Sequence, residues 1–214
     1  MAGISGPNIV MDGLVFGVDA ANSQSYSGSG TTWNDISGNG NNGTLYSSPT
    51  FSNDNGGKFN FESADYVDCG FVLSQTAYTK SAWFRPESAT RNIISGPSQH
   101  AFWMANTDNQ LQAGHQGAWS TVSHTVPSGD MLNQWWNGAV TYNNSTGWVL
   151  YLNGVQVDTD SNTTDPNNQT GVYIARYGNG NNFDGDIAEV LIYDRAITAA
   201  EVLQNYQALK ERYL

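Results

Sequence analysis

The pattern of apolar and polar positions is most informative near the C-terminal end of the sequence. Residues 187–193 are apolar except for Glu189, which is typical of a strand covered on both faces at the centre of a sheet. Thr198 stands three residues before Glu201, the spacing of a capping box at the start of a helix. Four residues then recur at helical spacing and predict the face by which this helix docks: Val202, Tyr206, Leu209 and Tyr213.

Upstream of this segment, apolar and polar residues alternate in short runs, as in strands with one buried face. Asn153 and Gly154 separate two such runs and predict a type I′ hairpin, because both residues accept a positive φ. Residues 58–61 and 66–69 predict a second hairpin across residues 62–65. We expect roughly a dozen strands, and a central final strand whose neighbours are remote in sequence indicates a sandwich.

The sequence predicts one large domain preceded by a short arm. Its 214 residues are enough for one all-β domain with a full core, and no long-period repeat or linker divides them. Residues 1–11 contain Gly and Pro without strand alternation, and we assign them as an N-terminal arm suited to contact a partner chain. The domain itself is assigned to residues 12–214.

Composition and charge restrict the partners. Aromatic residues make up 12% of the chain and Gly numbers 23, which favours strands joined by tight turns. Eight Lys and Arg stand against 19 Asp and Glu, a formal net charge of −11. We therefore expect no binding to nucleic acid or to an anionic membrane surface. The single cysteine, Cys69, rules out an internal disulfide and is expected to be buried.

The first residues do not have the pattern of a targeting segment. No basic region followed by an apolar run is present, so no signal peptide is predicted. No apolar stretch is long enough for membrane insertion. We expect synthesis in a cytoplasm, which leaves the final location open.

Five pieces of sequence stand in this order along the chain: GLVF with Asp19 (13–19), DISGNGNNGTL (35–45), WNGAVTY (136–142), VLYLNG (149–154) and FDGDIAEVLIYDRA (183–196). Together they resemble the laminin-G-like branch of the concanavalin A-like lectin/glucanase superfamily. The resemblance implies an all-β, concanavalin A-like jelly-roll sandwich of two antiparallel sheets. The short C-terminal helix follows from the capping box and the helical spacing described above.

Residues 5–10, 27–33 and 199–206 carry a narrower resemblance. They are similar to versions of this domain in virion proteins of tailed bacteriophages, notably those of marine bacteria. This resemblance implies a structural or adhesive virion protein, a capsid decoration or a component of a tail fibre or appendage. The implied partners are other virion proteins, copies of the same chain, and glycans of the host surface or the environment.

A glycoside hydrolase is the enzymatic alternative. Glucanases of this fold carry two carboxylates on alternate positions of one strand, one protonated and one ionised. The nearest candidate is Asp184, Asp186 and Glu189, where Asp replaces the first Glu of the pattern and shortens the reach of that carboxylate. Fold alone does not establish activity, so we predict a non-enzymatic protein without catalytic residues.

A structural Ca²⁺ is the cofactor that the resemblance implies. Many relatives hold one near the first strand, the last strand and the Ser-Gly-Asn-Gly loop. Hard oxygen ligands suit Ca²⁺, and the positions that would converge in this fold are Asp19, Asn39, Asp184 and Asp186. The alternative is that Asp19 and Asn39 only form Asx turns, and no EF-hand pattern is present.

Carbohydrate binding needs an exposed aromatic face for the C–H groups of a sugar and polar groups for its hydroxyls. Trp119, in a Gly-rich stretch with His115 and Gln116, is the first candidate; Tyr177 with Asn179 is the second. A packing role for Trp119 is an open alternative. Strand positions indicate a core role for three tryptophans and leave two others open: core for Trp83, Trp136 and Trp148, open for Trp103 and Trp135.

Two classes of non-enzymatic function therefore remain. A decoration or assembly protein would use the arm and the last helix for attachment and would show no sugar affinity. A carbohydrate-binding module acting mainly as a Ca²⁺-dependent lectin would expose Trp119 and lose its glycan affinity in a chelator.

Overall fold

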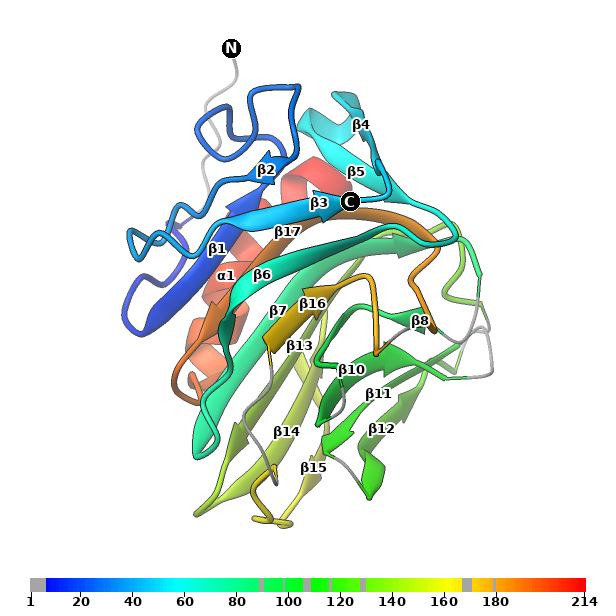
Figure 1. Cartoon of the computed structure of the whole chain (residues 1–214). Helices are drawn as coiled ribbons and strands as arrows, with labels where there is room; N and C mark the ends of the chain where they lie inside the picture. The colour runs from blue at the N-terminus through cyan, green and yellow to red at the C-terminus, as the bar shows by residue number, and fades with distance from the viewer. Residues whose placement is uncertain are drawn as a thin grey trace.

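A computed structural model of the chain describes residues 7–88, 91–97, 99–105, 109–115, 117–127, 130–166, 171–178 and 180–214. These residues form seventeen strands, one short 3₁₀ helix (Asp54–Gly56) and one α-helix, α1 (Ala199–Tyr213). The strands make two antiparallel layers, and α1 lies outside one of them (Figure 1). The prediction of an all-β sandwich with a short C-terminal helix is confirmed.

The first layer is an eight-stranded sheet. Its spatial order is β15 (Val155–Asp160), β14 (Gly147–Leu152), β13 (Trp136–Asn143), β7 (Ala77–Pro86), β17 (Gly185–Tyr193), β5 (Lys58–Phe61) and β4 (Thr50–Ser52), with β1 (Leu14–Asp19) also paired to β17. β17 is buried along its whole length, between β7 on one side and β1 and β5 on the other. The predicted central strand with neighbours remote in sequence is thus confirmed.

The second layer consists of two smaller sheets. The five-stranded one has the order β2 (Thr32–Trp33), β3 (Gly43–Tyr46), β6 (Tyr66–Val72), β16 (Gly171–Ile174) and β9 (Ile94–Ser95). The four-stranded one has the order β12 (Ala118–Thr125), β11 (Gln110–His115), β10 (His100–Met104) and β8 (Arg91–Asn92). They meet where β8 and β9, separated by the buried Ile93, each pair with a different sheet.

The pairing of residues 58–61 with 66–69 as a hairpin is wrong. β5 pairs with β4 and β17 in the first layer, whereas β6 pairs with β3 and β16 in the second. The intervening turn carries the chain from one layer to the other. Phe59 and Phe61 therefore meet Val67 and Cys69 across the core instead of side by side in one sheet. The predicted Asn153-Gly154 hairpin does form, with φ of 51° and 75°, and joins β14 to β15.

Helix α1 begins at the predicted capping box. The Thr198 hydroxyl accepts a hydrogen bond from the Glu201 amide, and the Glu201 carboxylate accepts one from the Thr198 amide. The apolar face of α1 covers the outer side of the eight-stranded sheet, where Tyr213 stacks on the buried Trp83 with ring centroids 4.6 Å apart. Within the described ranges, no helix has the length and apolar character needed to cross a bilayer.

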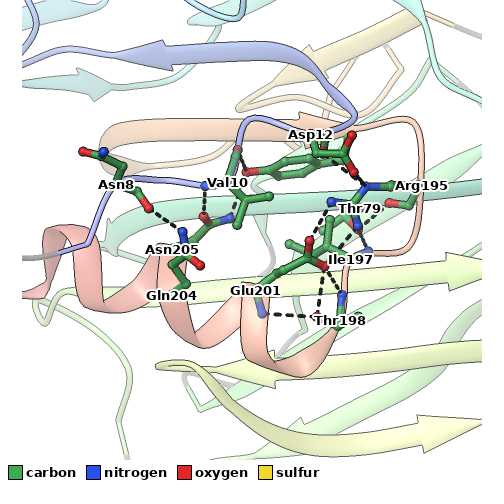
Figure 2. Close-up of polar contacts among 11 residues, drawn as sticks. Asn8, Val10, Asp12, Thr79, Arg195, Ile197, Thr198, Glu201, Gln204 and Asn205 are labelled. Carbon is green, nitrogen blue, oxygen red and sulfur yellow. Dashed lines mark hydrogen bonds and ion pairs between the residues drawn. The ribbon is translucent and has the colours of Figure 1, made fainter.

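The described part of the N-terminal arm lies along α1 (Figure 2). Val10 is buried; its amide donates to the Asn205 side chain at 2.8 Å, and its carbonyl accepts from the Tyr193 hydroxyl at 2.9 Å. Asn205 also donates to the Tyr193 hydroxyl at 2.9 Å. The carbonyl of Asn8 accepts from Gln204. Residues 7–11 therefore form part of the packed body in this chain, whereas residues 1–6 of the assigned arm lie outside the described residues.

Candidate functional site

A solvent-open cleft of about 360 Å³ lies on the outer face of the four-stranded sheet. Its aromatic lining comes from Trp103 of β10, Trp119 of β12 and Tyr177 in the loop after β16. Phe102 and Met104 face the core, so the alternation of β10 turns Trp103 outward to the cleft. The cleft thus gathers three partly exposed aromatic rings from three separate segments.

The rings are held in a defined arrangement. Trp119 and Tyr177 meet edge to face, with ring centroids 5.4 Å apart and planes at 75°. The indole N–H of Trp103 donates to the Trp119 carbonyl at 3.3 Å. Edge-to-face packing leaves part of each ring face uncovered, and an uncovered face is what a flat apolar ligand surface requires.

The polar side of the cleft is fixed by Asn92. Its side-chain N–H donates to the Asn181 carbonyl at 3.0 Å, and its oxygen accepts from the Ser95 hydroxyl at 2.8 Å. Asn92 is buried, so these bonds anchor the loop between β16 and β17 to the sheet. Asn181 itself is exposed and, with Ser120, offers polar groups at the mouth of the cleft.

The structure brings together Trp119 and Tyr177, the leading residues of the two predicted sugar-binding stretches. Gln116 and Asn179 lie outside the described residues. Sequence reasoning left Trp103 open and did not select Asn92 for the site. The signal for Trp103 was available, because it lies between Phe102 and Met104 in an apolar run and must face the opposite side from both.

His115 does not lie in this cleft. Its Nδ1 lies 3.0 Å from the Thr164 carbonyl, so Nδ1 carries the proton and Nε2 accepts from the Tyr78 hydroxyl at 2.9 Å. The ring also packs against Tyr142 and Trp148. Burial lowers the pKa of His115 from 6.5 to about 4, which keeps this histidine neutral at pH 7.

The four positions predicted for Ca²⁺ are engaged separately. Asp19 forms a bidentate ion pair with Arg212 and an Asx turn to the Ala21 amide. Asp186 is paired with both Lys58 and Arg85. Within the described ranges, no three His, Cys, Asp or Glu side chains form a group that could hold a metal ion. The donor set at these positions therefore does not fit a shared cation.

The other two predicted ligands also have partners within the protein. The Asp184 carboxylate accepts from the Ser88 hydroxyl at 2.8 Å. The Asn39 side chain donates to the Leu14 carbonyl at 2.9 Å. The loop that contains Asn39 is organised by Asp35, whose oxygens accept from the amides of Gly17, Ser37 and Asn41. Burial alone would raise the pKa of Asp35, but these hydrogen bonds together outweigh it and lower the pKa.

The carboxylates of the enzymatic alternative are enclosed. Asp186 is 1% exposed and Glu189 is 3% exposed. Both lie on the side of β17 that faces away from the core between the layers. Burial, followed by the charge of Asp19, raises the pKa of Glu189 well above its usual range.

The chain belongs to the concanavalin A-like lectin/glucanases superfamily. This family matches residues 61–203, more than half of the sequence. The matched range includes the three rings of the cleft and the whole of β17. Among curated protein sequences, none matches the chain.

Solved structures share the fold at low sequence identity. Trypanosoma rangeli sialidase in complex with sialic acid aligns with a TM-score of 0.70, 13% identity, and coverage of 96% of this chain but 34% of the sialidase. Domain 4 of AbnA, a GH43 extracellular arabinanase from Geobacillus stearothermophilus, in complex with arabinotriose, aligns with a TM-score of 0.66 and 20% identity. The alignment covers 91% of this chain and 98% of the arabinanase domain. The binding domain of Paraclostridial Mosquitocidal Protein 1 aligns with a TM-score of 0.68 and 17% identity, and the alignment covers 92% of this chain and 52% of the toxin domain. This chain spans about a third of the sialidase and about half of the toxin domain.

Proposed function

We propose that this chain is a non-enzymatic glycan-binding protein that holds a sugar in the cleft of Trp103, Trp119 and Tyr177. A sugar ring has an apolar C–H face and a rim of hydroxyls. Aromatic faces pack on the first, and amide or hydroxyl groups such as those of Asn181 and Ser120 bind the second. Small-molecule sites have volumes of roughly 300–1,000 Å³, and the cleft of about 360 Å³ is near the lower end.

One observation carries the proposal. Trp119 and Tyr177 come from distant segments, yet their rings meet 5.4 Å apart at a surface opening instead of in the core. A packing role would be expected to bury them. Structural neighbours described in complex with sialic acid and with arabinotriose make sugars a reasonable ligand class to test.

The burial of Asp186 and Glu189 supports binding over hydrolysis. A glycosidase needs one ionised and one protonated carboxyl group within reach of the scissile bond. Asp186 is paired with Lys58 and Arg85, and Glu189 interacts electrostatically with Arg212 and Tyr213 of α1. We therefore propose that the protein binds glycans without cleaving them.

The test is a glycan array that includes arabino-oligosaccharides and sialylated glycans, followed by titration of the strongest hit. Trp119→Ala is expected to weaken binding by about 2 kcal/mol, roughly thirtyfold, as for a central aromatic contact. Trp135→Ala, which removes a half-buried tryptophan next to Tyr213 of α1, is the matched control. No signal on the array, or equal affinity of Trp119→Ala and the unsubstituted chain, would contradict the proposal.

Calcium dependence separates this proposal from the lectin alternative. None of the described residues that line the cleft carries a carboxylate, and Asp19 and Asp186 are paired with protein cations. We expect the titrated affinity to be the same in EDTA and in millimolar Ca²⁺. An affinity that falls in EDTA would favour the Ca²⁺-dependent lectin.

We further propose that the protein is a component of a virion. The resemblance of residues 5–10, 27–33 and 199–206 to phage virion proteins supports a place on a particle surface, as a capsid decoration or in a tail appendage. Mass spectrometry of purified particles that contain the chain, with identification of the proteins crosslinked to it, tests this placement. Absence of the chain from such particles would overturn it.

A further inference from the structure

A second depression, of about 300 Å³, adjoins the aromatic cleft. Its wall is more polar than that of the aromatic cleft and includes Ser47, Ser63, Tyr66 and Arg176. Ser47 follows β3, and Ser63 lies in the turn between β5 and β6. Tyr66 is the first residue of β6, and Arg176 follows β16. The depression therefore belongs to the five-stranded sheet and its loops. The aromatic cleft belongs to the four-stranded sheet, and the two depressions lie side by side where the two sheets of the second layer meet.

The two depressions share a wall. Asn181, which lines the aromatic cleft, also lines the second depression. A third depression of about 300 Å³ shares Ser63, Asn181 and Asn182 with the second one. The loop between β16 and β17, orange in Figure 1, therefore borders three adjacent depressions.

The second depression is built from side chains that are held in place. Tyr66 stacks on Tyr46 with ring centroids 4.7 Å apart and planes at 5°. The guanidinium of Arg176 lies 4.3 Å from the Tyr66 ring centroid. The Asn182 side chain donates to the Ser63 carbonyl, which ties the loop to the turn between β5 and β6. Such preorganisation reduces the ordering entropy that a ligand must overcome.

The two parts of the groove differ in chemistry. The cleft offers three aromatic rings, whereas the second depression offers hydroxyl, amide and guanidinium groups. A linear oligosaccharide can stack one ring on the aromatic part while the hydroxyls of the next residues bind the polar part. We propose that the two depressions form one groove that binds an internal stretch of several linked sugar residues, not one terminal sugar. This inference rests on the proposed glycan-binding function.

Affinity as a function of chain length tests the groove. The probes are arabino-, xylo- and cello-oligosaccharides of one to six residues, titrated by calorimetry. In a series that binds, affinity is expected to rise at least tenfold between one and four residues and then to level off. Ala64 is exposed and lines the second depression, so Ala64→Trp should block it and reduce the affinity for a tetramer to that for a monomer or dimer. Ala200→Trp, on the exposed side of α1, is the matched control.

The outcomes separate the two proposals. Binding that requires Trp119 but does not change with chain length, or that is unaffected by Ala64→Trp, overturns the extended groove and leaves the glycan-binding function intact. Binding that does not require Trp119, or no binding in any series and on the array, overturns the proposed function itself. Thermal unfolding of Ala64→Trp verifies that it is folded, and Ala64→Phe, a smaller block, replaces it if it is not.

Discussion

At the scale of single residues, the interior of the sandwich holds an unusual set of titratable groups. Lys80 is fully buried, and its amine lies 2.7 Å from Nδ1 of His100 and 3.3 Å from the Ile94 carbonyl. Burial lowers the pKa of Lys80 and of His100 well below their usual values. His115 lies nearby in the aromatic cluster of Tyr78 and Trp148. A neutral Lys80 amine and a neutral His100 ring can share one hydrogen bond, and a charge on either group would be buried. The folded core therefore disfavours protonation of these groups.

Acid should therefore destabilise the fold through His115. Its pKa is about 4 in the folded chain and 6.5 in the unfolded chain, so the unfolded state binds the proton first as pH falls. The stability lost between pH 6.5 and 4 from this group is on the order of 3 kcal/mol. His115→Gln should lose correspondingly less stability between pH 7 and pH 4.5, measured by urea unfolding. His124→Gln, in β12, is the control for removal of a histidine. An equal decrease in unfolding free energy between pH 7 and pH 4.5 for His115→Gln and the unsubstituted chain would contradict the argument.

The same residue shows what residue-level prediction missed. The sequence places His115 close to Trp119 in a Gly-rich stretch, which predicts that the two residues share a site. In β11, however, Leu111 and Ala113 face the core, and His115 has the same parity. Strand alternation therefore indicated an inward ring. The sequence indicates Trp119 and Tyr177 only through their Gly- and Asn-rich surroundings and polar neighbours. The fold is needed to show that the two rings meet.

At the scale of elements, α1 is joined to the body through polar groups as well as through its apolar face. Asn205 is buried on the inner side of α1 and bonds both the amide of Val10 and the hydroxyl of Tyr193 in β17. Arg195 forms a bidentate pair with Glu201, which lowers the pKa of Glu201 to about 2. Arm, last strand and helix therefore form one unit (Figure 2).

Asn205→Ala should release the arm. The substitution leaves the buried Val10 amide without its partner, which costs about 1–3 kcal/mol of unfolding free energy. The Tyr193 hydroxyl loses one hydrogen bond and keeps the one to the Val10 carbonyl. Hydrogen exchange at the Val10 amide should become at least tenfold faster, as measured by NMR. Gln207→Ala, at an exposed position of the same helix, should leave both quantities unchanged. Unchanged Val10 exchange in Asn205→Ala would show that the arm is held by other contacts.

Elements with local signals were predictable, and those defined by remote partners were not. The Thr198 capping box and the Asn153-Gly154 turn are set by a few adjacent residues, and both form as predicted. Strands β5 and β6 were also located, but their partners depend on which layer each joins. The sequence of residues 62–65 does not distinguish a hairpin turn within one sheet from a connection between the two layers.

At the scale of the whole molecule, one ion pair connects segments from opposite ends of the sequence. Arg212, near the end of α1, binds Asp19 of β1 at 2.9 and 3.0 Å, across a separation of 193 residues. Asp19 is the Cα partner of Glu189 in β17. The Arg212 charge therefore faces two neighbouring carboxyl groups and opposes the rise in the pKa of Glu189.

Arg212→Met should destabilise the entire fold. Removal of one partner of a fully buried pair costs about 3–5 kcal/mol, because the remaining charge is left uncompensated. Arg212 and Asp19 are partly exposed, so the expected loss is at or below the lower end of this range. The raised pKa of Glu189 means that the folded state binds more protons above pH 4.5, so the stability contributed by this group falls as pH rises. The loss in Arg212→Met should therefore be larger at pH 8 than at pH 5, as measured by urea unfolding. The control is Lys210→Met, which removes an exposed pair with Glu211 and should have little effect on stability. If the stability lost in Arg212→Met does not change with pH, Glu189 is not the cause of the pH dependence.

The position of β17 has a consequence for biosynthesis. During translation, β1 emerges first but has to wait for the synthesis of about 170 further residues before its partner leaves the ribosome. Until then β1 and β7 have open hydrogen-bonding edges, the kind of surface that recruits other strands. A nascent chain stalled before residue 185 thus cannot complete the first layer, because β1 and β7 both pair with β17.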